Sequence, residues 1–188
     1  MNMAAGSGFR TAGTVLERAF FERPAPVVAE NLMGKSLCRR SEGAIDRLTL
    51  NEVEAYDGFE DRASHAHRGR TLRNAVMFGR PGVCYVYLCY GIHWMLNIVT
   101  GPQDFPGAVL LRGAGAFSGP GRLTKGLGID GSMNQRPAIP RSGLWLEDGG
   151  IVVGRRDIQR TARVGVDYAG PRWSRRKWRW VWSGGQQT

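Results

Sequence analysis

The residues best suited to chemistry lie between positions 51 and 97. This segment begins with acidic and apolar residues, Asn51 to Tyr56, continues through a polar loop with histidines, and ends in an aromatic stretch that reaches Tyr90 and Gly91. Carboxylates can accept protons, tyrosine rings can stack on nucleic-acid bases, and histidines can donate or accept hydrogen bonds. Because the chain carries a net charge of +10, this combination favours chemistry on nucleic acid.

Cleavage of a base from DNA requires a side chain that takes the nucleotide out of the stack, a pocket with aromatic walls, and an activated water. Tyr90, next to Gly91 at a predicted hairpin tip, can fill the gap that an extruded base leaves in the minor groove. Tyr56 and Tyr87 are the candidate pocket walls, because their rings stack most strongly on an electron-poor alkylated base. His65 is expected to complete the pocket by hydrogen bonding to the base edge or to the sugar phosphate.

Glu54 is the predicted general base. Its carboxylate can deprotonate a water that attacks C1′, and its negative charge stabilises oxocarbenium character in the sugar. Glu52 is the competing carboxylate, and its earlier position on the strand is expected to place it deeper, in a structural hydrogen-bonding role. Residues 51–97 contain no lysine that could form a Schiff base, so strand scission at the abasic product is not expected.

Two other functions compete with this interpretation. In a non-catalytic nucleic-acid-binding module, Tyr87 and Tyr90 would stack on bases and Glu54 would be structural. Single tyrosines and glutamates are more often structural than functional, so only their combination favours the enzyme.

A metal-dependent hydrolase is the third possibility. Its ligands would be His65 and His67 together with Glu54 or Asp61. The chain offers no fourth ligand at a standard spacing and no Cys-x-x-Cys of the deaminase type. We therefore expect neither a metal nor another cofactor.

The elements that position these residues follow from the sequence pattern. Residues 47–56 are predicted to form a strand; if it is regular, one face carries Leu48, Leu50, Glu52, Glu54 and Tyr56. An irregular loop is expected over residues 58–74, and a β-hairpin over residues 83–100 with Tyr90 at or near its tip. A helix should follow Pro24 and Pro26 and end before Gly34. Further strands are predicted at residues 35–40, 105–112, 143–153 and 162–168, and a short basic helix at residues 122–127.

Residues 172–182 alternate basic residues with tryptophans. Such a strip can bind nucleic acid, but its strict period of two favours an edge strand. In that interpretation Trp178, Trp180 and Trp182 face the core, while Lys177 and Arg179 face solvent.

Length and composition predict one α+β domain over residues 14–188, preceded by a disordered tail over residues 1–13. The sheet should be mainly antiparallel, with flanking helices and a hairpin that protrudes into DNA. Three cysteines, Cys38, Cys84 and Cys89, are an odd number without metal-ligand spacing, so we expect reduced core residues. The sequence has neither a secretory apolar run nor a membrane-length one, so an intracellular soluble protein, acting as a monomer, is expected.

These motifs closely resemble the alkyladenine (3-methyladenine) DNA glycosylase family over roughly residues 20–170. The resemblance implies that the glutamate of Glu-Ala-Tyr, Glu54, activates water and that Tyr56 and His65 contact the flipped base. The hairpin Tyr-Val-Tyr-x-x-Tyr-Gly implies a pocket role for Tyr87 and an intercalating role for Tyr90.

The resemblance extends to residues on the following strands. It implies that Asn97 crowds the exocyclic amine of normal guanine and that Arg112 sits beside the catalytic water, and it includes the Gly-Pro-Gly-Arg-Leu segment at residues 119–123. Three basic residues fall where phosphate contacts would be useful, namely Arg70, Arg73 and Lys125. The Trp- and Arg-rich C-terminus and His67 depart from the family pattern.

The sequence thus predicts a cofactor-free, monofunctional DNA glycosylase of base excision repair. Its substrate is double-stranded DNA with alkylated or otherwise damaged purines, in the class of 3-methyladenine, 7-methylguanine, hypoxanthine or ethenoadenine. The product is an abasic site.

Overall fold

The longest strand of the chain, β3 (Ala44–Asp57), is the centre of the fold. It pairs antiparallel with β2 (Ser36–Ser41) along its first half and with β6 (Gly107–Ala114) along its second half. On residues 52–54 it also pairs with β10 (Arg179–Trp182). The predicted strand at residues 47–56 is therefore confirmed, and both of its edges are occupied where it carries its two glutamates.

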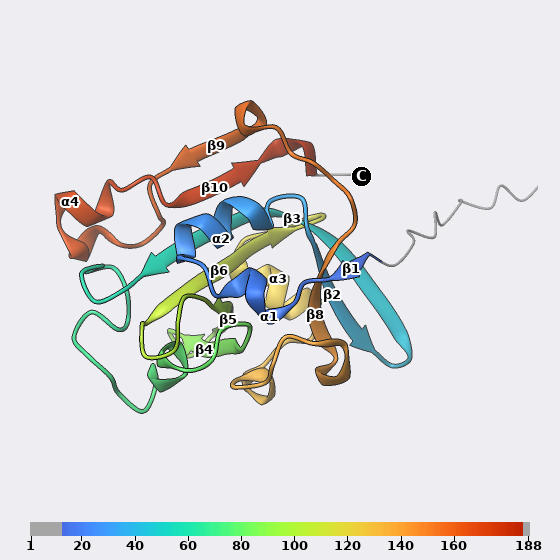
Figure 1. The fold of residues 1–188 in the computed structure, drawn as a ribbon, viewed down its shortest axis with the longest axis horizontal. Helices are drawn as coiled ribbons and strands as arrows, with labels where there is room; N and C mark the ends of the chain where they lie inside the picture. Colours follow the sequence, from blue (N-terminus) through green and yellow to red (C-terminus); the bar gives the residue numbers. More distant parts are fainter. Residues whose placement is uncertain (1–12, 186–188) are drawn as a thin grey trace, which may run out of the picture.

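A computed structural model of the chain describes residues 13–185, and Figure 1 shows their arrangement. The described strands form one sheet in the order β1-β8-β2-β3-β6-β5-β4, with β10 pairing β3 and β9 and with β7 pairing β6. All pairings are antiparallel, so the predicted α+β domain with a mainly antiparallel sheet is confirmed. Residues 1–12 of the expected tail lie outside the described residues. The remaining strands are β1 (Thr14–Val15), β4 (Cys84–Cys89), β5 (His93–Val99), β7 (Phe117–Ser118), β8 (Leu144–Asp148) and β9 (Ile158–Thr161).

Helix α2 (Ala25–Leu32) lies across β3 and buries its apolar face there (Figure 1). It begins after Pro24, as predicted, because proline suits a helix start. It ends before Gly34, whose φ of +81° is the left-handed conformation that glycine adopts without strain. The Gly34 N–H donates to the Leu50 carbonyl at 3.0 Å, which ties the helix end to β3. The other helices are α1 (Arg18–Phe21), α3 (Pro120–Gly126) and α4 (Pro171–Ser174).

The register of β3 against β6 shifts between Leu50 and Val53. Regular alternation is therefore interrupted there, and the single face predicted from Leu48 to Tyr56 is not continuous. From Val53 to Asp57 the pairing is regular, so Glu54 and Tyr56 do share a face. A bulge of this kind changes the direction of side chains at the end of a strand.

The predicted hairpin is formed by β4 and β5, with Cys89 paired to His93. Tyr90 and Gly91 form the turn with φ values of +50° and +70°, and the Ile92 N–H donates to the Cys89 carbonyl at 3.0 Å. A tyrosine in the left-handed region is strained, and Tyr90 is also 94% exposed. The turn thus holds an aromatic ring in water.

The C-terminal region differs from two sequence predictions. β10 lies between β3 and β9, so it is not an edge strand, and Arg179 is half-buried against Glu52 where a solvent-exposed side chain was predicted. Trp178 and Trp180 do enter the core, and Lys177 is exposed. Residues 162–168, predicted as a strand, form a loop and a 3₁₀ turn instead, because the segment is held by side-chain contacts without a ladder partner.

Candidate active site

One pocket of about 350 Å³ collects the predicted chemical residues. It opens where the second half of β3 and the strands β4, β5 and β6 converge. The structure brings together the residues for which catalysis, base binding or intercalation was predicted: Glu54, Tyr56, His65, Tyr87, Tyr90, Asn97 and Arg112. They come from β3, the loop after it, the hairpin and β6, so the fold converts distant sequence motifs into one surface.

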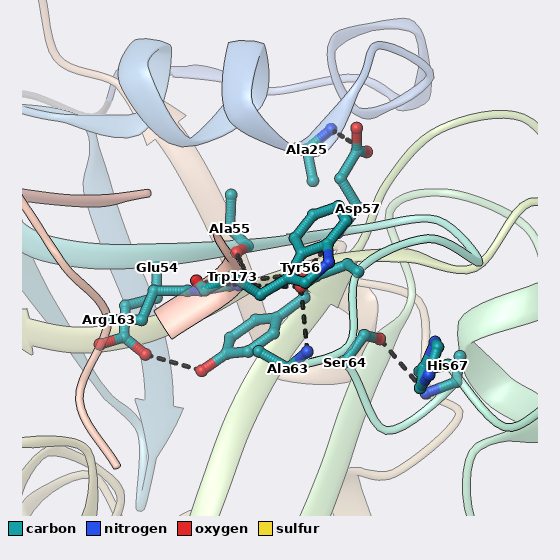
Figure 2. A network of polar contacts seen from close by, with 12 residues as sticks. Ala25, Glu54, Ala55, Tyr56, Asp57, Ala63, Ser64, His67, Arg163 and Trp173 are labelled. Atoms are coloured by element: carbon teal, nitrogen blue, oxygen red, sulfur yellow. Dashed lines mark hydrogen bonds and ion pairs between the residues drawn. The ribbon is translucent and has the colours of Figure 1, made fainter. Parts of the chain in front are cut away.

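Glu54 lies on the pocket floor with 0% of its surface exposed. One carboxylate oxygen accepts a hydrogen bond from the Tyr56 hydroxyl at 2.8 Å, and the other accepts from the Val164 backbone N–H at 2.8 Å. The Arg112 Nε is 3.5 Å from the same oxygen that Val164 contacts. Figure 2 shows Glu54 and Tyr56 side by side on β3. The carboxylate is therefore held in one orientation.

Burial raises the pKa of Glu54, and the Arg112 charge and the two hydrogen bonds only partly oppose this. A carboxylate whose pKa moves towards neutrality is a stronger base than an ordinary one. The pocket floor thus combines a fixed base with a neighbouring cation.

Glu52 behaves differently from Glu54, although only one residue separates them. It accepts hydrogen bonds from Arg112 Nε and from Arg179 Nε, both at 2.7 Å, and it does not line the pocket. Burial alone would raise its pKa, but these two arginines lower it. The prediction that Glu52 lies deeper is wrong, since 8% of Glu52 is exposed, against 0% of Glu54; the bulge in β3 redirects it towards Arg179.

The pocket walls are aromatic. The rings of His65 and Tyr87 meet edge to face with centroids 4.6 Å apart, and the Tyr85 ring lies 5.2 Å from that of Tyr87. The His65 Nδ1 and the Tyr85 hydroxyl are 3.1 Å apart. The surrounding walls and the Arg73 charge lower the pKa of His65, so its imidazole is neutral at pH 7.

Tyr85 was not predicted as a site residue. It is nearly fully buried, and burial raises its pKa to about 12, so its phenol keeps its proton. Its backbone carbonyl accepts a hydrogen bond from the Asn97 Nδ2 at 3.0 Å, and this bond orients the Asn97 amide in the pocket. Tyr85 and Tyr87 are two residues apart on β4, so they share one face of the strand, and this period was the signal that could have placed Tyr85 beside Tyr87.

The loop after β9 also contributes residues that were missed: Val164, Gly165, Val166 and Tyr168. It is fastened by Arg163, which is completely buried and forms an ion pair with Asp61. The Arg163 Nη1 also donates to the Ala55 carbonyl at 2.9 Å, and its guanidinium lies 4.7 Å from the centroid of the Tyr56 ring (Figure 2). A lone arginine among many gave no sequence signal of this anchor.

The position of Cys89 differs from the sequence prediction. Cys38 and Cys84 are buried core residues, as expected, whereas Cys89 is half-buried and lines the pocket. All three are free.

The three residues that were predicted to contact phosphates lie outside the pocket lining. Arg73 donates to the Leu88 carbonyl at 3.0 Å and stands 5.1 Å from the Tyr87 ring, so it braces the hairpin. The Arg70 guanidinium lies 5.6 Å from the Phe78 ring. Lys125 is exposed on α3.

The metal-site alternative gains no support from the geometry. Residues 13–185 contain no group of three or more His, Cys, Asp or Glu side chains that could hold a metal ion. His65 contacts Tyr85, and His67 donates from Nδ1 to the Phe59 carbonyl at 3.0 Å. In the same part of the chain, no helix is long and apolar enough to cross a membrane.

Comparison with known proteins places the chain among the DNA glycosylases. A family model described as Methylpurine-DNA glycosylase (MPG) matches residues 19–117 and 114–186, and the chain belongs to this family. Three similar proteins carry the name "Putative 3-methyladenine DNA glycosylase". One from Psychrobacter cryohalolentis is 39% identical over 93% of this chain and 94% of its own. One from Methanocella arvoryzae is 39% identical over 83% of this chain and 86% of its own. One from Anaeromyxobacter dehalogenans is 40% identical over 90% of this chain and 84% of its own.

Proposed function

We propose that this protein is a monofunctional glycosylase that extrudes alkylated or otherwise damaged purines from duplex DNA and excises them by water attack on C1′. The observation that carries the proposal is the buried Glu54 carboxylate beside Arg112, on the floor of an aromatic pocket. Family membership supports the reaction class, and the strongly basic charge fits a DNA substrate.

In the proposed reaction the C1′–N bond of the extruded nucleotide breaks, and its electron pair leaves with the purine. A water forms the new C1′–O bond and gives its proton to Glu54. The Glu54 charge also stabilises the cationic sugar while the bond breaks. The Arg112 charge, 3.5 Å from Glu54, favours the ionised carboxylate against the effect of burial, and in this proposal Arg112 also holds the attacking water beside Glu54.

Selectivity follows from the pocket walls. Alkylation at a ring nitrogen makes a purine cationic, so it stacks strongly on the faces of Tyr56 and Tyr87 and leaves easily as a neutral base. Because Nδ1 is engaged with the Tyr85 hydroxyl, a neutral His65 has its Nε2 left for the base edge, as donor or acceptor according to its tautomer, and it does not repel a cationic base. Asn97, held by the Tyr85 carbonyl, is positioned to crowd the exocyclic amine of normal guanine.

Extrusion is assigned to Tyr90. Its ring is 94% exposed at the hairpin tip and borders the pocket mouth, so it can enter the stack as the base leaves. None of the chain's three lysines lines the pocket, which supports hydrolysis without a Schiff base and without strand scission. We further propose that the protein acts as a monomer, without cofactor or metal, inside the cell.

Single-turnover excision tests the proposal. Labelled duplexes that carry hypoxanthine or a methylated purine are incubated with excess wild-type protein or with Glu54→Gln, and abasic sites are read after alkali treatment. Release by the wild type and loss of release by Glu54→Gln, with DNA binding retained, is the expected result. Binding without release from any damaged duplex would instead establish the non-catalytic module.

A further inference from the structure

A basic groove runs from the pocket mouth to the C-terminal helix and has no role in the mechanism above. Its first part, about 650 Å³, lies beside the pocket and shares His65 and Tyr168 with it. Its second part, about 350 Å³, continues along α4. The two parts are joined through Arg62 and His67. Figure 1 shows the loop after β3 and α4 at the same end of the molecule.

The groove is lined by exposed arginines. Arg62 and Arg68 come from the loop after β3, and Arg172 comes from α4; all three are exposed. Among residues 13–185, none of them forms an ion pair with a carboxylate. Glu60 is the acidic residue of the lining. A groove with three exposed arginines and one glutamate suits an anionic ligand.

The groove is also held in shape. The Tyr168 hydroxyl donates to the Ala63 carbonyl at 2.9 Å, which joins the loop before α4 to the loop after β3. The buried pair of Arg163 and Asp61 joins the same two segments from below. His67, which lies beyond Ser64 in Figure 2, is fixed by its bond to the Phe59 carbonyl. Both walls of the groove therefore keep their separation without a ligand.

We propose that this groove binds backbone phosphates of the DNA strand that carries the extruded nucleotide. The inference rests on the proposed function, because it needs that nucleotide to occupy the pocket. A strand whose base enters the pocket must leave past its mouth, where Tyr168 and His65 border both cavities. Successive phosphates are then within reach of Arg62, Arg68 and Arg172, whose guanidinium groups pair with phosphate oxygens in two-pronged fashion. The unassigned His67 and the C-terminal Arg172 thereby gain a common role.

The first experiment measures how DNA binding depends on salt. The double variant Arg62→Gln, Arg172→Gln removes two exposed charges from the groove and leaves the pocket lining unchanged. The logarithm of the DNA-binding constant falls with the logarithm of the salt concentration, and each lost phosphate contact makes this fall less steep by about 0.9. The double variant should therefore have a slope that is smaller in magnitude by about 1.8. The matched control is Arg141→Gln, Arg156→Gln, which removes two exposed arginines that do not border the groove. Equal slopes for the two double variants would overturn the proposal.

The second experiment locates the contacts. Single methylphosphonates, which lack the phosphate charge, are placed one at a time around the lesion in the damaged strand. At one or two positions the wild type should lose affinity while Arg62→Gln, Arg172→Gln shows no further loss. Losses of equal size in both proteins at every position would contradict the groove.

Base release separates this inference from the proposed function. With protein in excess and at saturation, the groove variant should excise the base at the wild-type rate, because Glu54 and Arg112 are intact. A wild type that shows the salt and methylphosphonate effects but releases no base would refute the glycosylase and leave the phosphate groove standing. Base release with none of those effects would refute the groove alone.

Discussion

The floor and the mouth of the pocket are built in opposite ways. On the floor, Glu54 is completely buried, and each of its oxygens accepts a hydrogen bond. At the mouth, 94% of Tyr90 and 70% of Tyr168 are exposed. The first region is fixed by contacts inside the protein, whereas the second presents aromatic surface to water.

This difference indicates how the two regions divide the work. Groups that act on a developing charge are effective when they are oriented before the substrate arrives, because no reorganisation is then needed during the reaction. Side chains that invade a duplex must instead be accessible first and become buried on binding. Substitutions on the floor should therefore affect chemistry or stability, and those at the mouth should affect extrusion.

Glu54→Gln should have the largest effect on activity. The amide keeps the shape of the side chain but cannot take a proton, and general-base catalysis contributes about 10²- to 10⁴-fold to a rate. We expect single-turnover excision to fall by at least about 10²-fold, with duplex affinity unchanged. Glu22→Gln, which alters an exposed carboxylate directly after α1, is the control and should excise normally. Comparable activity of Glu54→Gln and wild type would remove Glu54 from the mechanism.

Asp61→Asn should have the largest effect on stability. It leaves the completely buried Arg163 guanidinium without its counterion, and breaking a buried pair in this way costs about 3–5 kcal/mol. Denaturant unfolding measures the change. Glu22→Gln again serves as a control, because it breaks only the exposed pair with Arg18, and the loss should stay below about 1 kcal/mol. Similar losses for both variants would show that burial does not make the pair important.

Tyr90→Ala should separate extrusion from chemistry. Unstacking a base pair costs a few kcal/mol, so loss of the wedge should lower excision from a duplex by about 10- to 100-fold. The fold should remain intact because the ring is exposed. Tyr90→Phe keeps the ring and should retain most of the activity. Equal duplex excision by Tyr90→Ala and wild type would exclude the wedge role.

Much of the floor was predictable because its signals are local. The alternation that led to β3, the Tyr-Gly turn of the hairpin and the apolar run of β6 each depend on neighbouring residues. Glu54, Tyr56 and Tyr87 could therefore be assigned to strands that meet in one sheet.

The remaining features depend on distant contacts. The loop of Val164 and Tyr168 has no ladder partner, and it is fixed by Arg163 from beneath, so its strand-like sequence gave a wrong prediction. Likewise β10 alternates as an edge strand would, but β9 covers its outer edge. Period-two alternation identifies the two faces of a strand. It carries no information about which other strands pair with its edges.

The smallest expected effect is a difference between Glu52 and Glu54 in the dependence of stability on pH. Burial raises the folded-state pKa of Glu54 above its usual 4.5, so its contribution to stability is present below that pH and is lost as the pH rises through the folded pKa. The pKa of Glu52 is lowered despite its burial, by Arg112 and Arg179, so its contribution is present above pH 4.5 and is lost as the pH falls through the folded pKa. Relative to wild type, Glu54→Gln should therefore become more stable as the pH rises, and Glu52→Gln less stable. Unfolding free energies of the three proteins, measured in denaturant at pH values below and above 4.5, test the contrast. If both variants diverged from wild type in the same direction, the two neighbouring carboxylates would not hold opposite electrostatic roles.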